Sequence, residues 1–231
     1  MKRNCITLLA IFAFMILSLD TNSQNLSEVP TFKRYAKENA ELPAPAKNKK
    51  RIVFIGNSIT EFWASTHPYF FENNGYIGRG ISGQTSPQML LRFYRDVVAL
   101  KPTAVVINAG TNDIAENTGK YDADYTFDNI RAMADIAKSN KIKVILSSVL
   151  PAEKFVWNQR ITDAPQKIEA LNKRIKEYAK KNNYAYIDYY STLKDEKCGL
   201  PAKLSSDGVH PNAACYEIME KIAKKVIDKI N

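Results

Sequence analysis

The 231-residue sequence is 45% hydrophobic and 25% charged, and it carries a formal net charge of +9 at pH 7. This composition excludes an intrinsically disordered chain, and the length is typical of one globular domain with a sizeable core. The lysines are spread along helical stretches, without an arginine-rich arm or a basic run interleaved with aromatic residues, so we expect no nucleic-acid partner.

The first segment in chain order, residues 1–24, has the features of a secretory signal peptide. Lys2 and Arg3 precede an apolar run over residues 5–19, and small or polar residues at 22–24 offer a cleavage site. The run is shorter than the ~20 apolar residues that span a membrane, although an uncleaved N-terminal anchor is the alternative. We therefore expect a secreted or periplasmic protein without integral membrane contact once the signal peptide is removed.

A polar stretch rich in proline follows this segment. Residues 25–50 include the run ELPAPAKNKK and are expected to form a lead-in with one short helical piece. The hydrophobic pattern of a folded domain begins at residue 51. The predicted organisation is therefore a signal peptide, a lead-in segment and one domain over residues 51–231.

From residue 51 onward, β-branched apolar segments alternate with amphipathic ones. The predicted strands are residues 51–56, 76–81, 104–110, 143–150 and 184–190. The main predicted helices are residues 86–100, 125–140, 165–182 and 212–230. This alternation predicts an α/β fold in three layers, α/β/α, around a parallel sheet. Five strands suggest a flavodoxin-like order, 2-1-3-4-5, in which ligands bind beyond the carboxyl ends of the strands.

Residues capable of chemistry follow the carboxyl ends of these predicted strands. Ser58 follows the first strand, Gly83 the second and Asn112 the third, and the segment SSDGVHPN at 205–212 lies beyond the fifth. Because the strands are parallel, their carboxyl ends meet at one edge of the sheet. These residues are therefore expected to lie close together.

The two histidines of the chain, His67 and His210, differ in their sequence surroundings. Asp207 stands three residues before His210, and Gly208 between them permits a tight turn. A carboxylate at this spacing can fix the imidazole tautomer, so that the other ring nitrogen can take a proton from a hydroxyl group. The structural alternative is that Asp207 or Asn212 caps the last predicted helix. His67 has no acidic residue close to it in sequence.

Three groups at the same edge are candidates for an oxyanion hole, in which each donor is often worth ~3 kcal/mol. Gly83 offers a backbone N–H that no side chain obstructs, Asn112 offers a side-chain amide, and Ser58 offers its own N–H. Each has a structural alternative: a loop glycine with positive φ, a capped turn and a helix cap, respectively. Their coincidence at one edge favours acyl-transfer chemistry.

Four sequence blocks resemble those of the SGNH hydrolases, also called GDSL-like lipases and acylhydrolases. The blocks are FIGNSIT with Ser58, GISGQT with Gly83, NAGTND with Asn112 and DGVHPN with His210, in that order. The resemblance extends over about residues 51–228, which is almost the whole predicted domain.

The resemblance implies ester hydrolysis without a metal or cofactor on a three-layer α/β/α fold. Ser58 would be the nucleophile, His210 the general base and acid, and Asp207 the carboxylate that orients the histidine. Gly83 and Asn112, with the N–H of Ser58, would form the oxyanion hole. The reaction would pass through an acyl-serine intermediate that water then hydrolyses.

One residue departs from the family pattern, because Asn57 stands where an aspartate usually precedes the serine. Asparagine can still hydrogen-bond the turn and is not part of the triad, so we expect activity to survive. The alternative is a non-catalytic carbohydrate-binding module with the same fold. The presence of Ser58, Asp207 and His210 argues against that alternative.

The candidate substrate contacts are Trp157 and Arg160, in a loop at residues 151–165 beside the predicted site. The alternative is that Trp157 only holds this loop in place. The aromatic run at 61–76 is expected to form helix and core. The sequence contains no extended apolar helix that could act as a lid over a long lipid chain. This favours a small acyl group, acetyl, on a carbohydrate. A lysophospholipase or a thioesterase is the alternative activity.

Two cysteines remain beyond the signal peptide, Cys198 and Cys215. They could form a disulfide in an oxidising compartment or remain buried free thiols, and their spacing favours neither. The cysteines and histidines are widely separated and show no metal-ligand spacing, so no metal is expected. The sequence gives no indication of oligomeric state.

Overall fold

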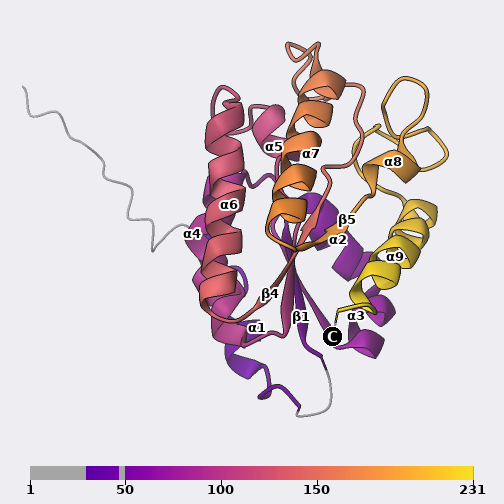
Figure 1. The fold of residues 1–231 in the computed structure, drawn as a ribbon. Coiled ribbons are helices and arrows are strands. Elements are labelled where there is room, and N and C mark those ends of the chain that lie inside the picture. Colours follow the sequence, from indigo (N-terminus) through magenta and orange to yellow (C-terminus); the bar gives the residue numbers. More distant parts are fainter. Residues whose placement is uncertain (1–29, 47–49, 231) are drawn as a thin grey trace, which may run out of the picture.

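A five-stranded parallel sheet forms the centre of the computed structural model, which describes residues 30–46 and 50–230 (Figure 1). The strand order is β2-β1-β3-β4-β5, and every pair of neighbours is parallel. The predicted flavodoxin-like order is therefore confirmed. The strands are β1 Ile52–Gly56, β2 Tyr76–Gly80, β3 Ala104–Ile107, β4 Lys143–Ser147 and β5 Ala185–Ile187.

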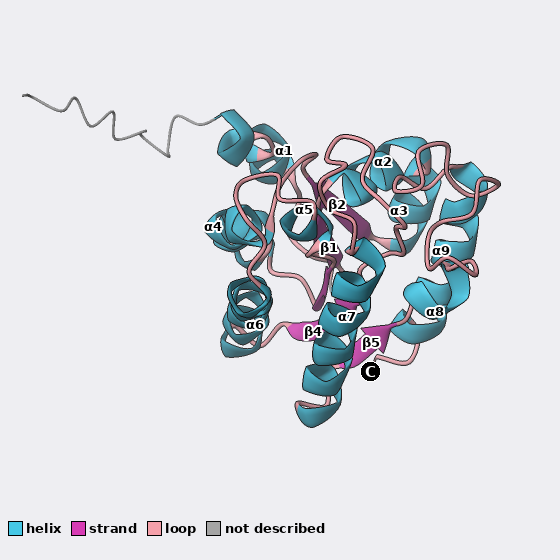
Figure 2. Ribbon diagram, turned by 90° about the horizontal axis from the view of Figure 1, so that it is seen from above, coloured by secondary structure: helices cyan, strands magenta, loops and turns pink. Residues whose placement is uncertain are grey.

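Helices cover both faces of this sheet, as the view from above shows (Figure 2). The α-helices are α1 Ala36–Glu41, α2 Ser58–Thr66, α3 Pro68–Asn74, α4 Ser86–Asp96, α5 Thr111–Ile114, α6 Ala123–Ser139, α7 Ala164–Lys181, α8 Tyr190–Leu193 and α9 Ala213–Ile227. The described residues also contain the 3-10 helices η2 Pro30–Lys33 and η3 Val98–Leu100. The predicted three-layer α/β/α architecture is confirmed.

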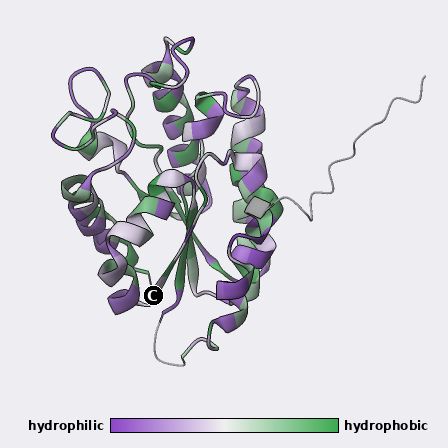
Figure 3. Ribbon diagram, turned by 180° about the vertical axis from the view of Figure 1, so that it is seen from behind, coloured by the Kyte–Doolittle hydropathy of each residue, from purple (hydrophilic) through white to green (hydrophobic). Residues whose placement is uncertain are grey.

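The core has two halves because successive residues of a strand point to opposite faces of the sheet. Val53 and Ile55 of β1 pack with buried residues of α4, α6 and α7 on one face. Ile52 and Phe54 pack with buried residues of α2, α3 and α9 on the other face. Since both faces are covered, the strands are hydrophobic throughout and the outer helix surfaces are mostly hydrophilic (Figure 3).

Some element boundaries differ from the sequence prediction. The predicted strand at 104–110 ends at Ile107, because the chain turns through Gly110, with φ of 122°, into the short helix α5. The predicted helix at 86–100 ends at Asp96, since Val97 has a non-helical backbone (φ −127°, ψ −67°). The predicted strand at 184–190 is reduced to β5, and α8 begins within it.

The aromatic run at 61–76 forms helix and core, as expected from its sequence. Trp63 and Phe71 are buried and pack edge-on against Phe54 of β1. Trp63 also stacks on Tyr216 of α9, with ring centroids 5.7 Å apart. These rings fill the interface between α2, α3, α9 and the sheet.

The structure describes only part of the N-terminal region for which the sequence makes predictions. The expected signal peptide, residues 1–24, lies outside the described residues. The lead-in segment contains η2 and α1, and Tyr35 between them is buried. Within residues 30–46 and 50–230, no helix combines the length and the apolar character needed to cross a membrane.

Candidate active site

A tight turn at the carboxyl end of β1 places Ser58 at the edge of the sheet. Gly56 is needed there, because a Cβ at this position would approach Thr60 Oγ1 to 2.1 Å. Asn57 is the N-cap of α2, and its Oδ1 accepts the backbone N–H of Ile59 at 3.0 Å. Ser58 is then the first residue of the helix and is 7% exposed. Asn57 therefore provides the cap that an aspartate would also provide.

Ser58 and His210 come together although they are far apart in sequence. Ser58 Oγ lies 2.9 Å from His210 Nε2, and His210 Nδ1 lies 2.6 Å from Asp207 Oδ2. The two contacts expected from the sequence are therefore present. His67 lies elsewhere: its Nδ1 contacts Thr66 Oγ1 at 3.1 Å. An oriented Ser-His-Asp arrangement can make a serine oxygen nucleophilic.

The loop before α9 holds the Asp207 carboxylate in place. Asp207 Oδ1 accepts the backbone N–H groups of Val209 at 2.9 Å and His210 at 2.8 Å, and the Ser205 hydroxyl at 3.0 Å. Burial opposes ionisation, but the hydrogen bonds from the His210 ring and from these N–H groups outweigh it and lower the pKa of Asp207 to about 2. A charged carboxylate is thus available to stabilise a protonated imidazole.

The last helix has its own cap, which removes the structural alternative for Asp207. Asn212 is the N-cap of α9, and its Oδ1 accepts the N–H of Cys215 at 3.1 Å. Gly208, with φ of 78°, makes the turn that brings Asp207 under the imidazole. Asn212 therefore caps α9, and Asp207 contacts the His210 ring.

The loops after β2 and β3 bring Gly83 and Asn112 together. Gly83 has φ of 78°, and the next residue, Gln84, accepts the side-chain Nδ2 of Asn112 through its backbone oxygen at 2.9 Å. Asn112 is 3% exposed on α5. An amide nitrogen carries two N–H groups, so one N–H of Asn112 remains for a ligand.

A buried carboxylate that the sequence reasoning missed anchors the Asn112 loop. Asp113 accepts the Ser86 hydroxyl at 2.6 Å and the Ser86 N–H at 3.0 Å. Burial raises the pKa of Asp113, and these hydrogen bonds act against it. Asp113 thereby ties α5 to the first residue of α4. Its position directly after Asn112 was the available sequence signal.

Two partly exposed aromatic rings, those of Trp157 and Phe62, lie close to the His210 ring. Trp157 is 44% exposed, its ring centroid is 6.0 Å from that of His210, and its Nε1 donates to Asn117 Oδ1 at 2.9 Å. Phe62 is 41% exposed, with its ring centroid 5.5 Å from that of His210. Phe62 was missed in the sequence, although it lies four residues after Ser58 and hence on the same side of α2.

A hollow lined by Trp157 connects the predicted substrate residues with the loop that carries Gly83. It has a volume of about 830 Å³. Trp157 and Arg160 line it together with Gly83, Asn117 and Asn158. Arg160 is exposed, and its Nε donates to Asn158 Oδ1 at 3.2 Å. Both predicted substrate residues therefore border open space next to the site.

The cysteines and other ligand-type side chains form no additional centre in the described part of the chain. Cys198 and Cys215 are free thiols, so they form no disulfide, and of the two only Cys215 is buried. Burial raises the pKa of the Cys215 thiol to about 11, which keeps it protonated. Within residues 30–46 and 50–230, no group of three or more His, Cys, Asp or Glu residues could hold a metal ion.

Comparison with known proteins places these features in a family. The family model of the GDSL-like Lipase/Acylhydrolase family matches residues 54–218. The crystal structure of a GDSL-like lipase from Bacteroides thetaiotaomicron VPI-5482 is 58% identical, with a TM-score of 0.85, and the match covers 87% of this chain and 98% of that chain.

Two acetylxylan esterases are more distant relatives. The one from Xylanibacter ruminicola is 29% identical over 227 residues, which is 82% of this chain but 44% of that relative. The one from Geobacillus stearothermophilus is 23% identical over 152 residues, which is 63% of this chain and 68% of that relative. This chain therefore spans less than half the length of the first of these relatives.

Proposed function

The chain belongs to the GDSL-like lipase/acylhydrolase family, and thus to the carboxylic ester hydrolases, and we propose that it removes acetyl groups from carbohydrate through an acyl-serine intermediate. The observation that carries this proposal is the contact of 2.9 Å between Ser58 Oγ and His210 Nε2, extended by the 2.6 Å contact between His210 Nδ1 and Asp207. A serine so oriented has the nucleophilicity that ester cleavage needs.

Acylation is the first step of the proposed reaction. His210 Nε2 takes the proton of Ser58 as Oγ bonds to the ester carbonyl carbon, and the carbonyl oxygen becomes negative. The Asp207 carboxylate, ionised because its pKa is about 2, stabilises the imidazolium. The C–O bond to the alcohol then breaks, and His210 returns the proton to the departing alcohol oxygen.

Deacylation repeats these steps with water in place of serine. His210 takes a proton from water as the water oxygen bonds to the acyl carbon. The bond from that carbon to Ser58 Oγ then breaks, and His210 returns the proton to Oγ. The N–H groups of Ser58 and Gly83 and the amide of Asn112 would stabilise the negative oxygen in both steps. Asn112 is suited to this role because Gln84 fixes its amide at 2.9 Å.

The surroundings of the serine support a carbohydrate as the alcohol part of the ester. Trp157 and Phe62 present partly exposed aromatic surfaces beside His210, and such surfaces pack well against the C–H faces of sugar rings. The hollow of about 830 Å³ that Trp157 lines also presents the amide side chains of Asn117, Asn158 and Gln159 and the charged groups of Glu116 and Arg160. The acetylxylan esterases among the relatives act on an acetylated polysaccharide, as their name states.

The proposal is tested first with p-nitrophenyl acetate and then with a panel of esters. Wild type should hydrolyse the model ester, and Ser58→Ala should not. His67→Ala is the matched histidine control and should behave as wild type. Acetylated xylo-oligosaccharides should then be cleaved with a higher kcat/KM than lysophospholipids, acyl thioesters or long-chain p-nitrophenyl esters. Equal rates for wild type and Ser58→Ala would contradict the assignment of Ser58 as the nucleophile. A preference for long acyl chains would contradict the proposal of an acetylated carbohydrate as substrate.

We also propose that the protein is exported, on the basis of the pattern in residues 1–24, which lie outside the described residues. N-terminal sequencing of protein recovered from periplasmic and extracellular fractions tests this directly. A mature N-terminus close to residues 22–25 is expected. An intact Met1 in the membrane fraction would instead indicate an uncleaved anchor.

A further inference from the structure

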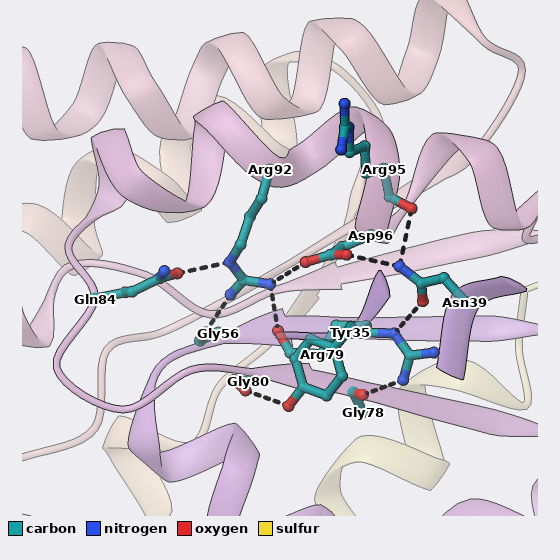
Figure 4. A network of polar contacts seen from close by, with 10 residues as sticks. All are labelled: Tyr35, Asn39, Gly56, Gly78, Arg79, Gly80, Gln84, Arg92, Arg95 and Asp96. Carbon is teal, nitrogen blue, oxygen red and sulfur yellow. Dashed lines mark hydrogen bonds and ion pairs between the residues drawn. The ribbon is translucent and has the colours of Figure 1, made fainter. Parts of the chain in front are cut away.

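The guanidinium of Arg92 is hydrogen-bonded to the turn before Ser58 and to Gln84, and the proposed reaction does not use it directly. Arg92 is on α4, is 1% exposed, and makes four hydrogen bonds of 2.6–2.9 Å within the described residues (Figure 4). Burying a charge is costly, and a buried ion pair is often no more stabilising than apolar side chains of the same size. The burial of an arginine here therefore calls for a reason other than stability.

The acceptors of these hydrogen bonds belong to the chain segments that carry the site. Arg92 Nη2 donates at 2.9 Å to the backbone oxygen of Gly56, two residues before Ser58. Arg92 Nε donates at 2.6 Å to the side-chain oxygen of Gln84, which directly follows Gly83. One planar guanidinium thus links the serine turn to the loop after β2, and its rigid fork fixes the two relative to each other.

The side chain and the backbone of Gln84 extend this link to the third candidate donor. Its side-chain oxygen binds Arg92, and its backbone oxygen accepts Nδ2 of Asn112. Its own Nε2 is buried and has no hydrogen-bond partner within the described residues. The contact with Arg92 is therefore the hydrogen bond that holds this side chain.

The outer side of the network keeps the guanidinium itself in place. Asp96 Oδ2 accepts Arg92 Nη1 at 2.9 Å, and Asp96 Oδ1 accepts Asn39 Nδ2 at 2.8 Å. Asn39 Oδ1 accepts Arg79 Nε at 2.8 Å, and Tyr35 Oη donates to the backbone oxygen of Gly80 (Figure 4). Tyr35 and Asn39, from the lead-in segment, therefore complete the network around Arg92.

We propose that Arg92, acting through Gln84, is a positioning residue for ester hydrolysis. Arg92 holds the serine turn and the loop after β2 so that the N–H groups of Ser58 and Gly83 and the amide of Asn112 converge on the developing oxyanion. This inference rests on the proposed function, because it needs those groups to act as the oxyanion hole. Small misplacements of such groups cost rate rather than substrate affinity.

The variant Gln84→Met tests the link with little change in side-chain volume. With p-nitrophenyl acetate, kcat should fall about 10- to 100-fold while KM changes less than about 3-fold, since the oxyanion exists only in the transition state. The inhibition constant of a trifluoromethyl ketone, whose adduct with serine is an oxyanion, should rise by a similar factor. Arg92→Lys, which keeps the charge beside Asp96 but loses the fork, should change both quantities in the same direction.

Ser148→Ala is the matched control for the loss of a buried hydrogen bond. The Ser148 hydroxyl accepts the N–H of Tyr190 at 2.9 Å, and among the described residues Ser148 has no hydrogen bond to a member of the Arg92 network. Thermal unfolding of each variant sets an assay temperature at which it is folded, and under that condition the control should keep the wild-type kcat.

The outcomes separate this inference from the function on which it rests. A wild-type kcat and a wild-type inhibition constant in folded Gln84→Met would overturn the positioning role and leave the esterase proposal intact. A fall in kcat without a change in the inhibition constant would also overturn it, because the oxyanion groups would then be unaffected. Absence of Ser58-dependent hydrolysis in wild type would overturn the proposed function and this inference with it.

Discussion

The two sides of the candidate site are built in contrasting ways. Ser58, Asn112 and Arg92 are buried, and each is held by hydrogen bonds to a neighbouring element. The other side, formed by Trp157 and Phe62 next to His210, is exposed, and the loop carrying Trp157 is irregular in structure. The difference indicates that the reacting groups need a fixed geometry, whereas the residues facing the substrate can vary without loss of the chemistry.

The largest effect is expected for His210→Ala, on the buried side. Removing the general base should lower kcat/KM for p-nitrophenyl acetate by about 10⁴- to 10⁶-fold, the range known for serine-histidine pairs. His67→Ala, the other histidine, should stay within about 2-fold of wild type. Steady-state kinetics on both variants measures this. A fall of less than about 10-fold in His210→Ala would show that another group takes the proton of Ser58.

A smaller loss of activity is expected for Asp207→Asn. The amide can keep one hydrogen bond to the imidazole but cannot stabilise its positive charge, so kcat should fall by about 10³- to 10⁴-fold. The decrease should be similar at pH 7 and pH 9. Stopped-flow or steady-state rates at the two pH values measure it.

The same variant tests the electrostatics of Asp207 through protein stability. Its folded-state pKa of about 2 lies below its usual value of about 4, so the carboxylate contributes stability above pH ~4 and loses that contribution as the pH falls towards 2. Urea unfolding of wild type and Asp207→Asn should therefore show a difference in the free energy of unfolding that shrinks between pH 4 and pH 2. A constant difference would contradict the low pKa.

On the exposed side, Trp157→Ala should weaken the binding of a carbohydrate substrate more than it slows the chemical step. We expect KM for acetylated xylo-oligosaccharides to rise about 10-fold, because one stacking surface is worth ~1 kcal/mol or somewhat more. Rates with p-nitrophenyl acetate should stay within about 3-fold of wild type. Asn117→Ala, which removes only the hydrogen-bond partner of Trp157 Nε1, should give a weaker effect of the same kind. Equal losses for both substrates would mean that Trp157 holds His210 in place instead.

The smallest change in activity is expected at Asn57, the departure from the family pattern. Asn57→Asp keeps an oxygen to accept the N–H of Ile59, so kcat/KM should remain within about 3-fold of wild type. Asn57→Ala removes the N-cap of α2 and should lower the free energy of unfolding by about 1 kcal/mol. Denaturant unfolding and ester hydrolysis of the two variants check this. A large gain of activity in Asn57→Asp would indicate an enzyme that has lost part of its function.

The sequence predicts the sheet order and the meeting of the four family blocks, because both follow from regular alternation and from the geometry of parallel strands. It does not predict α5 or α8, since helices of four residues are too short to show a hydrophobic period. It also does not predict that Arg92 is buried. An arginine in the amphipathic helix α4 suggests a solvent-facing position, and its burial depends on Gly56, Arg79 and Gln84, which precede that helix.

The most direct test of the central claim is to identify the residue that a fluorophosphonate modifies. Digestion and mass spectrometry should find the phosphonyl group on Ser58, with stoichiometric labelling of wild type, strongly slowed labelling of His210→Ala and none of Ser58→Ala. Labelling of any other residue in wild type, or no labelling of active wild type, would contradict the assignment of Ser58 as the nucleophile.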